Sequence, residues 1–415
     1  MRDSLPGSET SEKPLPRTFN VFWLGQSVSA LGDAMTIVAM PLVVLAVTSS
    51  VEQMGRLTAL ARIGGLIATA LAGFVVDRAE PRRVMLACDI FRFVLMALIP
   101  VAFFYDFRNV WLIFAVGVGV ALAQGAFYVG HVSLVAALVG RARVSLANSR
   151  VEGTIALAYV FGPLLAGLLS ARFGPETVLG IDALTFLVSA LALLAMGRVA
   201  AAPQETHEPA ASSKSTVGLA GFRFLGKQPE LWRLTILVAL CQFFTAAIVD
   251  LFIFRLKRDL GQGDIAAGLT FAIASAAAVA AAVSTPRLRA RFGFHRLWVV
   301  AVLLQGVALV GAYPAHSFAP IALAAAVYMA AMTVLMICQA SIRQELTPQH
   351  LLGRVTSTYM VLVTLPIPLG ALAATSLAAR WGAAMVMTGL GAGLLLTAAL
   401  AAALWVRLPT APRSP

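Results

Sequence analysis

Residues 54–105 have the sequence MGRLTALARIGGLIATALAGFVVDRAEPRRVMLACDIFRFVLMALIPVAFFY, and this stretch decides the fold. Two apolar runs, at 54–76 and 84–105, flank the short charged loop DRAEPRR. A helix of about 20 apolar residues crosses the hydrocarbon core of a bilayer, so each run predicts one transmembrane helix. The three arginines of the loop are typical of a connection on the cytoplasmic side of a membrane.

The same alternation of apolar run and polar loop extends in both directions over almost the whole chain. The 415 residues are 60% hydrophobic and only 12% charged, and the mean hydropathy is +0.87. This composition excludes a globular protein with a charged surface. We predict an all-α membrane protein with twelve transmembrane helices, at residues 19–47, 54–76, 84–105, 110–132, 153–171, 178–196, 234–254, 266–284, 297–312, 318–338, 355–379 and 383–406.

Lys and Arg residues are distributed unevenly between the two sides. If the N-terminus is cytoplasmic, 22 of the 31 lie on the cytoplasmic side, while Arg62 and Arg92 fall inside spans. This bias predicts a multi-pass protein of a bacterial inner membrane with both termini in the cytoplasm. The net charge of +12 then reflects topology and contact with anionic lipid, and we expect no nucleic-acid partner. The outer cluster of Arg255, Lys257 and Arg258 either attracts anionic compounds or merely departs from the bias.

A polar, low-complexity segment divides the spans into two sets of six. We predict an N-terminal bundle at 19–197, a cytoplasmic linker at 198–230, a C-terminal bundle at 231–406, and cytoplasmic tails at 1–18 and 407–415. The linker ends in VGLAGFRFLGK, which places Leu219, Phe222 and Leu225 on one face of a short helix at the membrane surface. A faint repeat supports two similar halves, since RRV at 82–84 matches HRL at 295–297, an offset of 213.

The loop after the second span carries a motif. Its residues resemble the G-x-x-x-D-R-x-G-R-R/K signature of the major facilitator superfamily, at Gly73, Asp77, Arg78, Arg82 and Arg83. The second glycine is missing, and Glu80-Pro81 takes its place. With this change, the loop resembles that of the branch of the superfamily that contains macrolide-efflux proteins and the enterobactin exporter.

Other segments resemble the same branch and follow in order between about residues 19 and 355. They are GQSVSALGD at 25–33, the Asp89 and Arg92 pair, SLANS at 145–149, GPLLAG at 162–167, IDALTFLVSA at 181–190, GFRFL at 221–225 and RQELTPQHLLGRV at 343–355. The resemblance implies the major facilitator fold, two six-helix bundles that give alternating access to one central cavity. It also implies a cytoplasmic gate formed by the signature residues together with Asp89 and Arg92.

The segment GPLLAG resembles a shortened motif of exporters that exchange substrate for protons. Gly162 and Gly167 permit close helix packing, and Pro163 removes a backbone donor. Helix packing without any bearing on transport direction remains the alternative.

Two ionisable residues lie well inside the predicted spans. Asp33 is about 21 Å along the first helix, and Arg62 lies at nearly the same depth on the antiparallel second helix. A charge at mid-bilayer costs about 2.5–3.5 kcal/mol or more and is seldom retained without use. We predict that Asp33 and Arg62 interact across a water-accessible cavity and that Asp33 is alternately protonated and ionised. The alternative is a permanent ion pair that only fixes helix packing.

In this superfamily the first, fourth, seventh and tenth helices line the central cavity. Carried over by position, the resemblance nominates Gln26, Ser29, Gln124, Tyr128, Gln242, Thr245, Tyr328, Thr333 and Gln339, with Phe22, Phe127, Phe243, Phe244 and Met329 around them. An apolar and aromatic wall with scattered polar groups favours a bulky amphiphile over a sugar or an inorganic ion. Each of these residues could equally bond a neighbouring helix.

Motifs for other chemistry are absent from the sequence. There is no phosphate-binding loop and no metal-ligand spacing, and the three cysteines fall within spans. We therefore expect no enzyme activity, cofactor or metal, and a monomer. The predicted function is proton-coupled export of a drug, macrolide-like or siderophore-like compound. An importer or facilitator of the same fold, or a non-transporting scaffold or sensor, are the alternatives.

Overall fold

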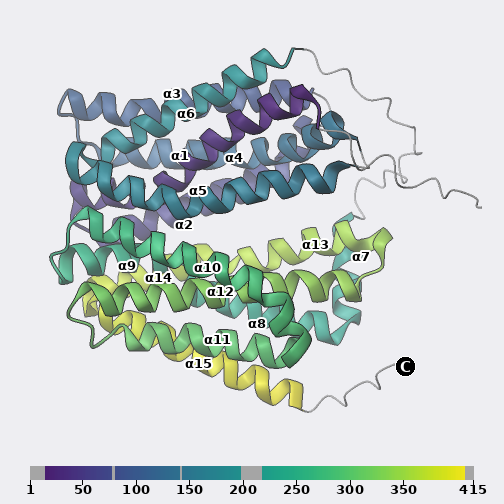
Figure 1. The fold of residues 1–415 in the computed structure, drawn as a ribbon. Coiled ribbons are helices and arrows are strands. Elements are labelled where there is room, and N and C mark those ends of the chain that lie inside the picture. Colours follow the sequence, from purple (N-terminus) through teal and green to yellow (C-terminus); the bar gives the residue numbers. More distant parts are fainter. Residues whose placement is uncertain (1–14, 77–79, 141–142, 198–216, 407–415) are drawn as a thin grey trace, which may run out of the picture. The chain divides into compact units, whose positions relative to one another are not determined.

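The structure is a computed structural model that describes residues 15–76, 80–140, 143–197 and 217–406 (Figure 1). Within these residues all regular structure is helical. Eleven helices or consecutive helix pairs are long and apolar enough to cross a membrane. The 26-residue helix α2 (Val51–Val76) lies where the second span is predicted. The prediction of an all-α membrane protein with twelve spans is confirmed.

The helices before the linker correspond one to one to predicted spans. Besides α2 they are α1 (Arg17–Thr48), α3 (Pro81–Phe104), α4 (Val110–Val139), α5 (Val144–Phe173) and α6 (Pro175–Ala195). After the linker come α7 (Val217–Lys227), α8 (Pro229–Thr245), α9 (Ile248–Phe254), the π-helix η2 (Arg255–Asp259), α10 (Asp264–Phe292), α11 (Phe294–Gly311), α12 (Phe318–Leu346), α13 (Gln349–Thr364), α14 (Pro366–Trp381) and α15 (Ala383–Val406).

Two predicted spans are each built from two consecutive helices. The seventh span breaks between Thr245 and Ile248, and the eleventh breaks at Leu365. Pro366 follows the second break at the first position of α14, where its missing N–H leaves no helical hydrogen bond unmade. Irregular backbone inside a span is tolerated where protein surrounds it.

The chain divides into two compact units that differ from the sequence halves at one place. The first unit holds the described residues of Met1–Met40 and Ile63–Ala210, and the second holds those of Pro41–Arg62 and Ala211–Pro415. Helices α1 and α2 therefore each contribute residues to both units. The hairpin 41–62 packs with helices that follow the linker in sequence. The division at the linker into bundles 19–197 and 231–406 stays a prediction.

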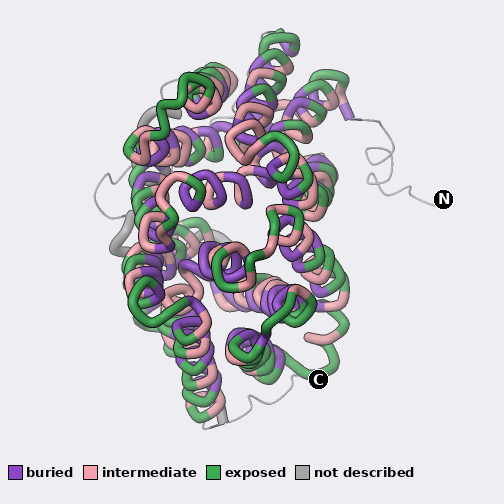
Figure 2. The backbone as a smooth tube through the Cα atoms, turned by 90° about the vertical axis from the view of Figure 1, so that its left-hand side faces the viewer, coloured by how far each residue is buried: buried purple, intermediate pink, exposed green. Residues whose placement is uncertain are grey.

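Burial follows the packing of helices within each unit. Along single helices, buried, intermediate and exposed residues alternate (Figure 2), as expected for helices with one packed side. In the second unit α11 packs against α12 and α15, and α10 packs against α12. The α11–α15 contact depends on Gly306 and Gly391, since a Cβ at Gly306 would lie 2.8 Å from the Gly391 carbonyl oxygen.

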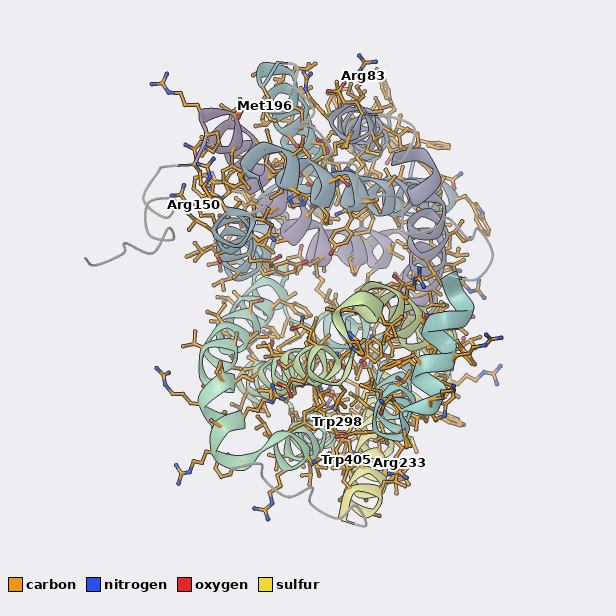
Figure 3. All side chains as sticks on the ribbon, turned by 90° about the vertical axis from the view of Figure 1, so that its right-hand side faces the viewer. Arg83, Arg150, Met196, Arg233, Trp298 and Trp405 are labelled. Carbon is orange, nitrogen blue, oxygen red and sulfur yellow. The ribbon has the colours of Figure 1, made fainter. Side chains whose placement is uncertain are left out.

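An aromatic cluster closes one end of the second unit. Trp298 of α11 is fully buried and lies beside Trp405 of α15 (Figure 3), with ring centroids 5.1 Å apart. The Trp405 ring also contacts those of Phe294 and His295. These contacts fix the position of the Trp298 indole.

The linker is followed by the helix α7, where the sequence predicts one. Its Leu225 is fully buried, and Gly221 packs so closely on α13 that a Cβ would lie 2.6 Å from the Arg354 carbonyl oxygen. Phe222 is exposed and contacts the ring of Trp232. The helix thus packs against protein on one side.

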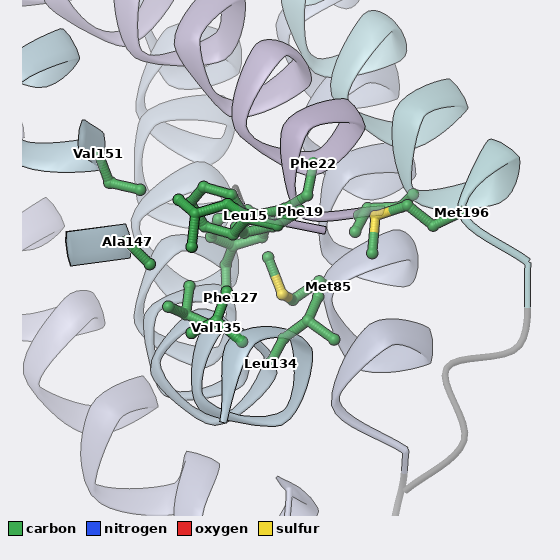
Figure 4. Packing of buried hydrophobic residues seen from close by; sticks show 12 residues of the cluster. Leu15, Phe19, Phe22, Met85, Phe127, Leu134, Val135, Ala147, Val151 and Met196 are labelled. Atoms are coloured by element: carbon green, nitrogen blue, oxygen red, sulfur yellow. The ribbon is translucent and has the colours of Figure 1, made fainter. Parts of the chain in front are cut away.

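The core of the first unit joins α1, α3, α4, α5 and α6 (Figure 4). Its buried side chains include Phe19, Phe22, Met85, Phe127 and Leu193. Phe22 and Phe127, which the sequence suggests as cavity walls, are 1% and 5% exposed and pack in this core.

Candidate functional site

A buried ion pair lies at the centre of the first unit. Asp89 and Arg92 are one turn apart on α3, and both side chains are almost completely buried. Ser189 Oγ of α6 donates a 2.6 Å hydrogen bond to Asp89 Oδ2. Arg92 also lies 4.2 Å and 4.3 Å from the ring centroids of Phe127 and Phe186. A buried ion pair is stable only when its remaining polar atoms are satisfied, and these contacts supply most of that requirement.

Two predicted cavity residues extend this network to neighbouring helices. Gln26 Nε2 of α1 donates a 2.7 Å hydrogen bond to Ser189 Oγ, and Arg92 donates to Gln124 Oε1 of α4. Gln124 is exposed, and Tyr128, one turn further along α4, is 61% exposed. The network therefore runs from the core of the unit to an accessible side of α4, while Ser29 is buried at 3% exposure.

Asp33 of α1 is half-buried beside this network. Among the described residues, no group is hydrogen-bonded or ion-paired to its carboxylate. The charges of Arg92, Asp89 and Asp182 act on it. Asp33 is thus a carboxylate inside a span that has charged neighbours but no fixed partner.

Asp182 of α6 is a second buried acid next to Asp33, and the sequence did not single it out. It is fully buried and accepts hydrogen bonds from Thr36 at 2.6 Å and from Thr185 at 3.0 Å. Helix α1 approaches α6 closely here, because a Cβ at Gly32 would lie 2.1 Å from Asp182 Oδ1. Unlike Asp33, Asp182 has donors for both carboxylate oxygens.

The GPLLAG segment packs against the same part of α1. A Cβ at Gly162 would lie 2.6 Å from the Cβ of Ala34, the residue after Asp33. Pro163 and Gly167 are buried in α5. The segment therefore determines how closely α5 approaches the helix turn that carries Asp33.

The signature loop is described only in part. Gly73 lies in α2, and Asp77 and Arg78 lie outside the described residues. Arg82 donates to the carbonyl oxygens of Leu193 and Leu194 at 2.7 Å and 3.2 Å, at the end of α6. Arg83 is exposed and pairs with Glu80 at 3.0 Å (Figure 3). The cytoplasmic gate stays a prediction.

Arg62 belongs to the second unit and lies near another buried acid. Asp250 of α9 is 3% exposed, accepts a 2.8 Å hydrogen bond from Thr58 of α2, and is acted on by the charge of Arg62. Asp33 and Arg62 fall in different units, so their pairing stays a prediction.

The outer basic cluster is engaged within the second unit. Arg255 donates to the carbonyl oxygens of Ala312, Tyr313 and Ala315, which lie between α11 and α12. Lys257 pairs with Asp264, and Arg258 donates to Ser49 of the hairpin 41–62. Each cation of the cluster therefore has a structural partner.

The second unit contains a small polar cavity between α8, α11 and α12. Its volume is about 30 Å³, and its walls include Gln242, Thr245 and Gln339, three of the predicted cavity residues. Two further polar residues, Trp298 and Gln305, come from α11. The sequence analysis missed them because α11 is not one of the four cavity helices. One indication of this site is present in the sequence, since Gln305 is a single amide in the otherwise apolar span 297–312.

Other predicted residues of α8 and α12 pack elsewhere. Tyr328 is 4% exposed and contacts the ring of Phe252, and Thr333 donates to the Met329 carbonyl oxygen at 3.0 Å. Phe243 packs on α14, since a Cβ at Gly370 would lie 2.2 Å from its carbonyl oxygen. The ring of Phe244 packs on Gly393 of α15.

Gln339, which lines the cavity, is also held by a hydrogen bond from helix α13. Tyr359 Oη of α13 donates a 2.9 Å hydrogen bond to Gln339 Oε1. The Arg343 guanidinium lies 4.5 Å from the centroid of the Tyr359 ring. The bond from Tyr359 uses Gln339 Oε1, and the amide nitrogen of Gln339 makes no hydrogen bond within the described part of the chain.

Eleven candidate membrane spans, together with α2 at the predicted second span, define a polytopic membrane protein. The chain belongs to the major facilitator superfamily, whose family model matches residues 22–371. Membership of this family indicates a non-enzymatic transport protein.

Two curated relatives agree with the branch that the sequence motifs indicate. The "Multidrug efflux pump Tap" of Mycobacterium tuberculosis (strain ATCC 25618 / H37Rv) is 34% identical over 189 residues, 44% of this chain and 45% of that protein. The match thus spans less than half the length of Tap. The "Enterobactin exporter EntS" of Shigella flexneri is 25% identical over 349 residues, 82% of this chain and 80% of that protein.

Solved structures show the same fold. The nucleoside transporter NupG has a TM-score of 0.77 at 12% identity, covering 95% of this chain and 100% of that one. A bacterial homologue of the human lysosomal transporter Spinster has a TM-score of 0.72 at 16% identity, covering 95% and 98%. At such low identity the likeness concerns the fold alone.

Proposed function

We propose that this protein exports a bulky amphiphilic compound across a bacterial inner membrane in exchange for protons, with both termini in the cytoplasm. Similarity to two relatives, named as a multidrug efflux pump and an enterobactin exporter, supports the export of such a compound. The observation that carries the coupling step is the free carboxylate of Asp33.

Asp33 differs from the two neighbouring acids, Asp89 and Asp182, in its hydrogen-bond and ion-pair partners. Asp89 has Arg92 and Ser189, and Asp182 has Thr36 and Thr185. Among the described residues Asp33 has no such donor. A carboxylate that lacks hydrogen bonds in a poorly hydrated place is stabilised either by binding a proton or by accepting a hydrogen bond from a donor group of the cargo.

This competition couples the two movements. When a proton binds Asp33, the acid becomes neutral and loses its charge attraction for a cationic cargo, and it accepts hydrogen bonds from the cargo more weakly. When the cargo occupies the site, the ionised form is favoured and the proton leaves. Arg92 and Asp89 exert opposite influences on Asp33, so a small shift of α1 against α3 changes the balance.

The cargo is proposed to be large, apolar in part and polar in part. The exposed side of α4 offers the ring of Tyr128 next to the amide of Gln124. Among the described residues, no group of three or more acidic, His or Cys side chains is placed to hold a metal ion. A drug, a macrolide-like compound or a siderophore-like compound fits this chemistry.

The decisive experiment is a panel of antibiotics, dyes and siderophores tested in a pump-deficient host that expresses the protein, with and without an uncoupler. Wild type should lower the accumulation of some compounds, and the uncoupler should restore it. Asp33→Asn should abolish this gradient-driven efflux while the protein stays in the membrane. The exposed carboxylate Glu152 provides the control, since Glu152→Gln should export normally.

Three results would contradict the proposal. Undiminished efflux by Asp33→Asn would remove Asp33 from the coupling step. Increased accumulation of a compound in expressing cells would identify an importer or facilitator. A protein that moves no compound in either direction, with or without a gradient, would point to a scaffold or sensor.

A further inference from the structure

The cavity between α8, α11 and α12 has an uncharged wall made of both polar and apolar side chains. Besides Gln242, Thr245, Trp298, Gln305 and Gln339, it is lined by apolar residues, one cysteine and two methionines, namely Val238, Cys241, Met332, Leu335 and Met336. No charged residue of the described chain lines it. A charged group entering this cavity would lose its hydration without gaining a counter-charge.

Two of the polar atoms that belong to this wall have no partner. Within the described chain, Trp298 Nε1 and Gln305 Oε1 are buried and make no hydrogen bond. Their residues are 0% and 2% exposed. One atom is a donor and the other an acceptor, and buried polar atoms are almost always satisfied in folded proteins. A group that accepts from Trp298 Nε1, or one that donates to Gln305 Oε1, would supply a missing partner.

The polar atoms are held in place before any ligand arrives. Packing on Trp405 fixes the Trp298 indole, and the hydrogen bond from Tyr359 fixes Gln339. Trp298 and Gln305 are seven residues apart on α11, so they lie on the same face of that helix. Rigid donors and acceptors of this kind raise selectivity, because little ordering is left to occur on binding.

We propose that this cavity is a subsite that receives a neutral hydroxyl or carboxamide group of the exported compound. This inference rests on the proposed export function and adds a chemical preference to it. A volume of about 30 Å³ admits a hydroxyl or an amide but not a ring. The subsite thus selects for one hydrogen-bonding group on a cargo whose apolar body lies elsewhere. An ordered water molecule is the rival occupant.

The test uses two bulky amphiphilic cations as probes. Doxorubicin carries several hydroxyl groups, and tetraphenylphosphonium has no hydrogen-bonding group. Gln305→Leu should lower the efflux of doxorubicin by about fivefold, the value of one lost hydrogen bond, and leave tetraphenylphosphonium efflux unchanged. Leu304→Met changes an exposed side chain of the same helix that does not line the cavity, and it should leave both unchanged. Retained efflux of tetraphenylphosphonium also shows that Gln305→Leu is folded.

A second measurement reads the subsite directly. In protein labelled with ¹⁵N-indole tryptophan, the resonance missing from Trp298→Phe identifies Trp298. Doxorubicin at saturation should shift this resonance, and tetraphenylphosphonium should not.

The outcomes separate this inference from the export function. If doxorubicin is exported but leaves the Trp298 resonance in place, or if Gln305→Leu lowers both probes equally or neither, the cavity holds water only and the subsite is rejected. If wild type exports neither of the two probes nor any antibiotic, dye or siderophore of the panel, the export function itself fails, and the subsite fails with it.

Discussion

Arg92 carries a positive charge into the interior of the first unit, where its nearest anion is on its own helix. The Asp89–Arg92 pair and the Glu80–Arg83 pair have the same i,i+3 spacing, yet the first is buried and the second has an Arg side chain that is 71% exposed. Their energetic weights should therefore differ strongly, because removing one member of a buried pair leaves an unmatched charge.

Arg92→Met is expected to destabilise the protein by about 3–5 kcal/mol, since Asp89 would remain buried without its cation. The double variant Asp89→Asn with Arg92→Met should recover most of this loss. Arg83→Met should cost about 0–1 kcal/mol, as is usual for an exposed pair. Thermal unfolding of the purified proteins in detergent measures all three. A double variant as unstable as the single one would show that the two residues are not coupled.

Sequence spacing predicts the Asp89–Arg92 pair but not the groups that complete it. Ser189 lies in an apolar span among other small residues, and nothing in its local sequence marks it as a partner of Asp89. Which faces of two distant helices meet is a property of packing, and hydropathy does not encode it. Trp298 and Gln305 escape prediction for the same reason.

Two of the three glycines in helix α5, Gly153 and Gly162, differ in their surroundings. Gly162 faces α1, while a Cβ at Gly153 would meet nothing within 4 Å. Close helix contacts in membranes depend on such small residues. The pair therefore offers a matched test of whether α5 must approach the turn of Asp33.

Gly162→Ala is expected to cost about 1–3 kcal/mol, because the new methyl group would overlap Ala34 and force α1 and α5 apart. Efflux should fall as well, since α1 carries Asp33. Gly153→Ala should be neutral or should stabilise the helix by up to about 1 kcal/mol. Melting temperature and efflux rate are measured for both. Equal behaviour of the two variants would rule out a role for the close contact.

Hydropathy predicts the spans well because lipid imposes the length and apolar character of every helix that crosses it. It does not predict the interruptions between α8 and α9 or between α13 and α14, since an interruption changes the hydrogen bonding of the backbone and not the polarity of the side chains. Pro366 marks the second interruption in the sequence. The first, at Ala246 and Ala247, follows from no residue type.

At the scale of the whole molecule, the distribution of Lys and Arg predicts the direction in which the chain crosses the membrane. Fusions to alkaline phosphatase, which is active only outside the cytoplasm, should be active at residues 313–317 and inactive at the C-terminus. Fusions to green fluorescent protein at the C-terminus should fluoresce. Phosphatase activity at the C-terminus would contradict the predicted orientation and would require the charge bias to be overridden.

The placement of the hairpin 41–62 in the second unit has a consequence for the integrity of the chain. A protein severed within the linker would yield an amino-terminal piece that keeps this hairpin but lacks the helices that clasp it. The carboxy-terminal piece would keep those helices but lack the hairpin 41–62, including the hydroxyl of Thr58 that donates a hydrogen bond to Asp250. Two such pieces made in the same cell should recognise one another and reassemble, in the way that an exchanged arm joins the subunits of a swapped dimer.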